Sequence, residues 1–85
     1  MAASRHEVVR VESRALLLRS VPVGEADLML TLFTLDRGTM SAAARGARKS
    51  SRRFGALEPL HDLVVTLDVR DGSEIAKLVD ARIER

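Results

Sequence analysis

Residues 60–84 read LHDLVVTLDVRDGSEIAKLVDARIE, and this stretch decides the fold that we expect. Its first half, residues 60–70, is the cleanest strand of the chain, because apolar residues alternate with more polar ones at Leu63, Val65, Leu67 and Val69. The turn Asp71-Gly72-Ser73 follows, and short glycine-containing turns join antiparallel strands. A further strand is predicted over residues 74–84, with one face formed by Ile75, Lys77, Val79, Ala81 and Ile83. The stretch therefore predicts a β-hairpin.

Upstream, period-2 patterns predict three more strands, over residues 9–21, 27–35 and 39–45. In the first of them the apolar frame changes near Ala15, and long barrel strands make such changes at a bulge or bend. Helix is the alternative for residues 25–35, which contain no internal breaker, but the threonines favour extended chain. The turn Asp36-Arg37-Gly38 fits a three-residue hairpin loop with a glycine bulge.

This order of strands predicts the fold class. Five strands, with tight turns after the second and fourth and a longer link after the third, outline an all-β OB-fold Greek-key barrel. We expect a flexible arm over residues 1–8 and one small domain over residues 9–85. The core must be aliphatic, because Phe33 and Phe54 are the only aromatic residues. Phe33 is expected in the core, and Phe54 is expected to plug the loop after the third strand onto the barrel.

That loop is strongly basic. Five of the 14 lysines and arginines lie within residues 45–53, a window without acidic residues, and they are Arg45, Arg48, Lys49, Arg52 and Arg53. A solvated loop is the simpler interpretation, but such crowded like charges are well suited to the phosphates of a nucleic acid. The strand before the loop places small side chains and Arg45 on one face, where a ligand could approach closely. Additional candidates for a phosphate track, each more simply a solvated residue, are Arg14, Arg19 and Arg37.

Several classes of site are disfavoured. The absence of cysteine excludes disulfides and thiolate metal sites, and no nucleophile constellation or phosphate-binding glycine motif is visible. His61 and Asp62 point to opposite faces of a strand, so His61 is expected to be a partly buried structural residue. Glu25 and Asp27 are too few ligands for a metal. We therefore expect no catalytic residue, cofactor or metal, and, without a secretory or membrane segment, a cytoplasmic protein.

Four parts of the chain carry a resemblance to a known family, and the two most specific segments are Gly-Glu-Ala-Asp at residues 24–27 and Ala-Arg-Gly-Ala-Arg-Lys at residues 44–49. Residues 24–34, Gly38, residues 44–50 (Ala-Arg-Gly-Ala-Arg-Lys-Ser) and residues 57–60 resemble the amino-terminal domain of the bacterial DNA repair protein RecO. The resemblance implies an OB-fold that binds single- and double-stranded DNA, with contacts at Arg45, Arg48 and Lys49. RecO proteins anneal strands and, with RecR, help to load the RecA recombinase onto DNA coated by single-stranded DNA-binding protein. A nucleoid-associated location in the cytoplasm follows from this role.

The chain also departs from the pattern of this family. Relatives often have lysine where Thr39 stands, further basic character where Ser41 stands, and an aromatic residue where Val23 stands. Full-length members continue into a helical domain, some with a zinc-binding module, whereas this chain stops at Arg85. An apolar barrel end or edge left uncovered would favour self-association of the isolated chain.

Two functions remain open from the sequence. The first is a non-catalytic DNA-binding module of a recombination mediator, which contacts DNA mainly through phosphates. The alternative is a protein-docking module whose basic loop binds an acidic partner.

Overall fold

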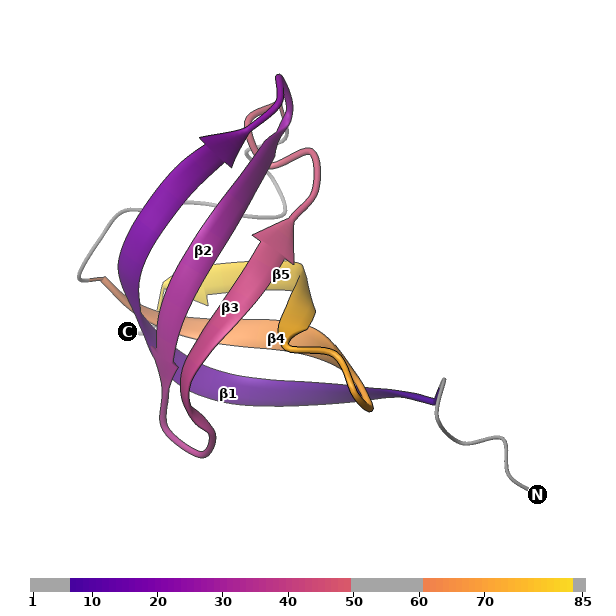
Figure 1. The fold of residues 1–85 in the computed structure, drawn as a ribbon. Helices are drawn as coiled ribbons and strands as arrows, with labels where there is room; N and C mark the ends of the chain where they lie inside the picture. Colours follow the sequence, from indigo (N-terminus) through magenta and orange to yellow (C-terminus); the bar gives the residue numbers. More distant parts are fainter. Residues whose placement is uncertain (1–6, 50–60, 84–85) are drawn as a thin grey trace.

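The computed structural model describes residues 7–49 and 61–83, which form five strands and no helix (Figure 1). The strands are β1 (Val8–Val23), β2 (Asp27–Thr34), β3 (Gly38–Ala44), β4 (Asp62–Arg70) and β5 (Ile75–Ile83). All five predicted strands are therefore confirmed, with ends that differ by at most two residues, and the helical alternative for residues 25–35 is excluded. Within the described part of the chain, no helix is long and apolar enough to cross a membrane.

The strands close into a barrel in the order β1-β2-β3-β5-β4. The long strand β1 bends, so that residues 8–16 pair with β4 and residues 15–23 pair with β2 (Figure 1). The barrel is completed by a short parallel contact in which residues 41–43 of β3 pair with residues 75–77 of β5. This topology is that of an OB-fold, and the predicted fold class is confirmed.

The core is aliphatic, as expected. Its largest fully buried apolar side chains are Leu17, Leu30, Leu32, Leu63, Val65, Leu67 and Leu78. In β2, the residues that face inward are Leu30, Leu32 and Thr34, which places Phe33 on the outer face with 53% of its surface exposed. The prediction that Phe33 belongs to the core is wrong, because neighbouring residues of a strand point to opposite faces.

The bulge expected in β1 is present. The pairing with β2 shifts between Leu17 and Arg19, so Leu18 is the extra residue. Leu17 is fully buried and Leu18 is 42% exposed. The set of alternate residues that faces the core therefore changes at Leu18. The sequence predicted this change near Ala15, three residues earlier.

A second bulge changes the frame of β5. Leu78 pairs with Leu67 and Asp80 pairs with Thr66, which leaves Val79 as the extra residue. The buried residues of this strand are Ala76, Leu78 and Ala81, whereas Ile75 and Ile83 are exposed. The single face predicted for residues 75, 77, 79, 81 and 83 is wrong, because the inward positions before the bulge are Ala76 and Leu78. Only beyond the bulge does the predicted frame turn inward, at Ala81.

The β2–β3 hairpin has a three-residue loop, as predicted, but the loop begins one residue earlier than the predicted turn Asp36-Arg37-Gly38. Leu35, Asp36 and Arg37 form the loop, and Gly38 follows with φ of 70°, the left-handed conformation of a glycine bulge. The buried hydroxyl of Thr34 accepts a hydrogen bond from the Arg37 N–H (3.0 Å) and donates one to the Gly38 carbonyl (2.8 Å). The loop is thus held by the one polar side chain that β2 turns inward at this end.

Candidate nucleic-acid interface

The β1–β2 turn contacts the start of the basic loop. The carboxylate of Asp27 accepts a hydrogen bond from the Gly46 N–H at 2.7 Å. Arg48 donates twice to the turn, from its backbone N–H to the Ala26 carbonyl (2.9 Å) and from its guanidinium to the Gly24 carbonyl (2.9 Å). These bonds fix the course of the chain as it leaves β3. They also give Asp27 a structural role, in place of the metal-binding role considered with Glu25.

Arg48 is therefore partly a structural residue. Its guanidinium is tied to the β1–β2 turn through one nitrogen, but the residue as a whole remains exposed. Arg45 and Lys49 are also exposed, and all three lie at the same end of β3. The described part of the basic loop thus presents three cations to solvent on a hydrogen-bonded turn. Arg52, Arg53 and Phe54, the other predicted residues of this loop, lie outside the described residues.

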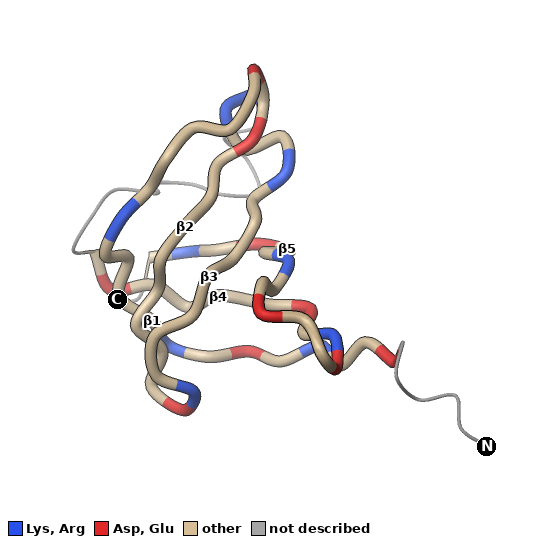
Figure 2. The backbone as a smooth tube through the Cα atoms, in the orientation of Figure 1, with Lys and Arg blue, Asp and Glu red and all other residues tan. Residues whose placement is uncertain are grey.

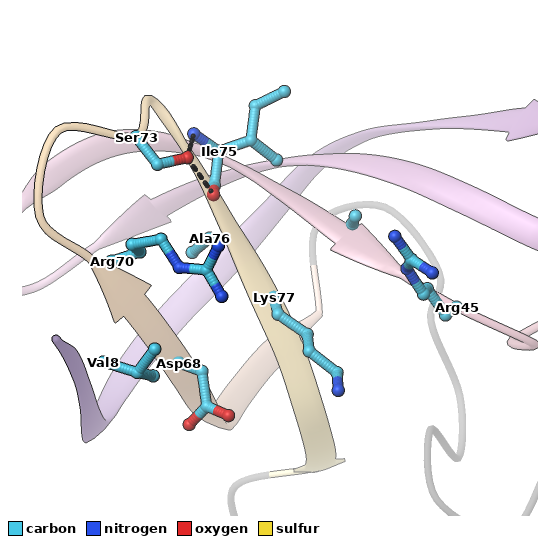
Figure 3. Close-up of a pocket in the computed structure, with 9 residues that line it drawn as sticks. Val8, Arg45, Asp68, Arg70, Ser73, Ile75, Ala76 and Lys77 are labelled. Carbon is cyan, nitrogen blue, oxygen red and sulfur yellow. Dashed lines mark hydrogen bonds between the residues drawn. The ribbon is translucent and has the colours of Figure 1, made fainter. Parts of the chain in front are cut away.

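An open pocket of about 440 Å³ lies beside this turn, between β3, β4 and β5 (Figure 3). Three exposed cations line it from three different elements: Arg45 after β3, Arg70 at the end of β4 and Lys77 in β5. Figure 3 shows Lys77 between the other two. The parallel pairing explains the convergence, since Lys77 pairs with Ala43, two residues before Arg45. The remaining lining residues are Val8, Ala43, Asp68, Ser73, Ile75 and Ala76.

The acidic side chain in the lining of this pocket is already neutralised. Arg10 donates from Nε to Oδ1 of Asp68 (2.8 Å) and from Nη2 to Oδ2 (3.0 Å). These hydrogen bonds and the charge of Arg10 lower the pKa of Asp68 below its usual value, and Asp68 in turn raises the pKa of Arg10. The carboxylate is therefore charged but paired, and Arg45, Arg70 and Lys77 leave the pocket positive.

We expect Asp68→Asn to lower the free energy of unfolding at neutral pH and to have little effect in acid. Because the pKa of Asp68 is lowered in the folded protein, its contribution is complete above the unfolded-state pKa of about 3.9. The contribution is lost as the pH falls below that value and through the folded-state pKa. Urea unfolding of both proteins at neutral pH and at several values below about pH 4 measures the difference. A difference that stays constant down to the lowest pH would contradict this assignment.

Two of the additional candidates lie at the opposite end of the barrel. Arg37 belongs to the β2–β3 turn, and the Leu35 N–H donates to the Arg14 carbonyl at 2.9 Å, which ties Arg14 to the same end. About 25 Å of extended strand separates Arg37 from Arg45. Figure 2 shows basic segments at both ends, one group beside the end of β3 and the other in the hairpin turn. The structure therefore does not bring Arg14 and Arg37 to the pocket.

The third additional candidate, Arg19, takes an intermediate position. It pairs with Thr31 in the middle of β2, and Thr31 pairs in turn with Ser41 of β3. This row lies on the outer face of the sheet, where Arg19 is exposed and Thr31 and Ser41 are half-buried. Arg19 therefore stands on the face between the two ends of the barrel.

Sequence reasoning missed Arg70 and Lys77. Each looks like an ordinary polar strand residue, and only the closure of the barrel places them with Arg45. The partial burial expected of His61 is confirmed, since this residue is half-buried just before β4. Across residues 7–49 and 61–83, no group of three or more His, Asp or Glu is placed to hold a metal ion.

Comparison with known proteins shows the family of the chain. A family model described as "Recombination protein O N terminal" matches residues 8–85. The chain is 46% identical over 77 residues to the DNA repair protein RecO of Anaeromyxobacter sp. (strain K), which covers 89% of this chain and 30% of that protein. It is 46% identical over 68 residues to the RecO of Koribacter versatilis (strain Ellin345), a match that covers 79% of this chain and 28% of that protein. The identity to the RecO of Myxococcus xanthus (strain DK1622) is 48% over 67 residues, which cover 78% of this chain and 28% of that protein.

These matches extend over nearly the whole chain but over less than a third of each relative. The chain spans about 30% of the length of the curated relatives that it matches. The resemblance found in four parts of the sequence is thus confirmed along the full barrel. With its five-stranded closed sheet and a family match from residue 8 to residue 85, this chain belongs to the family of recombination protein O amino-terminal domains.

Proposed function

We propose that this barrel is a non-catalytic DNA-binding module of a recombination mediator, and that it contacts single- and double-stranded DNA mainly through phosphates. The observation that carries the proposal is the convergence of Arg45, Arg70 and Lys77 around one open pocket, beside the turn that presents Arg48 and Lys49. The names of the relatives, which are DNA repair proteins, support a nucleic acid as the ligand.

The position of the cations suits this ligand. OB-folds commonly bind nucleic acid across the face of their second and third strands and the adjoining loops. On the outer face of β3, the side chains of Thr39, Ser41 and Ala43 are short, so a strand of DNA can approach the backbone closely. Phosphates fix position but carry no sequence information, and we therefore expect binding that is largely independent of sequence.

The role of the complete protein is part of the same proposal. In a longer chain, this module would hold DNA during strand annealing and during the loading of RecA, together with RecR and single-stranded DNA-binding protein. Such a protein would act in the cytoplasm at the nucleoid.

A salt titration tests the proposal. The chain is titrated with labelled single- and double-stranded oligonucleotides at roughly 50 and 200 mM salt. Three to five phosphate contacts predict that log K falls with log salt with a slope of about −2 to −4.5. A labelled acidic peptide with as many residues as the oligonucleotides have nucleotides is titrated in the same way. It tests the alternative, in which the ligand is an acidic protein. Tight binding to the peptide without binding to either DNA would overturn the proposal.

A further inference from the structure

The ring of Phe33 is exposed on the outer face of β2. We propose that it is a stacking platform for a base of single-stranded DNA, an inference that rests on the proposed function and extends it. Leu30, Leu32 and Thr34 occupy the inward positions of β2, so Phe33 makes no contribution to the centre of the barrel. An aromatic residue that is 53% exposed gains little from folding and is free to gain from a ligand.

The register places Phe33 on the surface that a nucleic acid would use. Its partner on β3 is Thr39, which is exposed and short, and its partner on β1 is the half-buried Leu16. From Thr39, the outer face of β3 continues through Ser41 and Ala43 to Arg45. This track of small side chains is about 20 Å long and leads to the cationic pocket.

The length and charge of this track fit a single strand. An OB-fold occupies roughly 4–16 nucleotides, so a strand whose phosphates meet Arg45 and Lys77 can reach Phe33 with another of its bases. The exposed Arg19 lies in the adjacent row of the sheet, opposite Thr31, where it can meet a phosphate on the way. Bases of a duplex are already stacked on one another. Phe33 should therefore favour single-stranded over double-stranded DNA.

Phe33 also borders an apolar pocket of about 210 Å³, together with Leu16 and the exposed Leu35. An apolar side chain of a partner protein is the competing occupant. Base stacking is favoured because the small face of β3 connects Phe33 to the cations, whereas the rim of the apolar pocket offers opposite charges in Arg14 and Asp62. The two ligands make different demands on residue 33, since stacking needs an aromatic ring and an apolar contact needs only bulk.

The test compares Phe33→Leu, which keeps an apolar side chain, with Phe33→Trp, which keeps an aromatic one. Loss of one stacked base corresponds to about 5- to 150-fold in affinity, so we expect Phe33→Leu to bind a labelled oligothymidylate at least about 5-fold more weakly. Binding to a duplex of equal length should change less than about 2-fold. The chain contains no Trp or Tyr, so Phe33→Trp introduces a single indole, whose fluorescence should be quenched by the single strand.

Leu35→Ala is the matched control, because Leu35 is 72% exposed in the adjoining turn and carries no ring. It should leave binding of both DNAs unchanged, and circular dichroism should show all variants folded. If Phe33→Leu binds the single strand as wild type does while wild type still binds with the expected salt slope, the inference fails and the proposed function stands. Equal losses of single-strand binding in Phe33→Leu and Leu35→Ala would show that apolar bulk, and not an aromatic ring, matters at this pocket, and would overturn the stacking role. If wild type binds no DNA, the proposed function itself fails.

Discussion

Simultaneous replacement of Arg45, Arg70 and Lys77 by alanine is expected to weaken binding to single- and double-stranded DNA and to flatten its salt dependence. The three cations line one pocket, and each can neutralise one phosphate. By counterion release, three lost contacts reduce the steepness of log K against log salt by about 2.1 for single strands and about 2.7 for duplexes. Between roughly 50 and 200 mM salt, the advantage of wild type over the variant should therefore shrink about 20- to 40-fold.

The control removes the same charge from the other end of the barrel. Arg14, Arg37 and Arg82 are exposed, and Arg82 makes only a long ion pair of 3.4 Å with the exposed Glu12. Alanine at these three positions should leave the slope for duplex DNA nearly unchanged, because surface cations without a bound phosphate release few counterions. Since all six side chains are exposed, neither variant should lose its fold. Equal flattening in both variants would contradict a localised site and indicate binding governed by net charge alone.

The strands could be predicted from sequence because their signals are local. Alternation over a few residues and a glycine in a turn specify a strand and a hairpin whatever the rest of the chain does. Local alternation did not indicate which residues of β2 are buried. Both of its frames are apolar, and the choice between Leu32 and Phe33 is made by the partner strands, where Leu32 lies opposite Leu17 and Met40 in the interior.

The candidate site could be predicted only in part, for a related reason. Arg45 and Arg48 stand out as members of a basic run, whereas Lys77 reaches Arg45 only through a parallel pairing between distant parts of the chain. The two most specific segments of the family resemblance lie about 20 residues apart in the sequence. The structure gives them a common physical basis, since the Asp27 carboxylate of one accepts the Gly46 N–H of the other.

Leu30→Ala is expected to be the most destabilising of the substitutions considered. Leu30 is fully buried in β2, and replacement of a buried leucine by alanine costs about 2.7–5.0 kcal/mol, depending on how far the site can collapse. A closed barrel has little freedom to collapse, which favours the upper part of this range. A domain of this size has a total stability of roughly 4–13 kcal/mol, so a large fraction of it would be lost. Urea unfolding should show a lower midpoint with an unchanged m-value.

Leu35→Ala is again the matched control, because it removes the same atoms from a side chain that is 72% exposed. Its cost should stay within about 0.5 kcal/mol, and equal costs at both positions would contradict the assignment of Leu30 to the core. The position of Leu30 also links the core to the site. Leu30 pairs with Ala42, and Ala42 pairs with Ala76 in the short parallel contact that closes the barrel. A cavity at Leu30 therefore lies beside the pairing that holds Lys77 near Arg45, and we expect the folded variant to bind DNA more weakly than Leu35→Ala does.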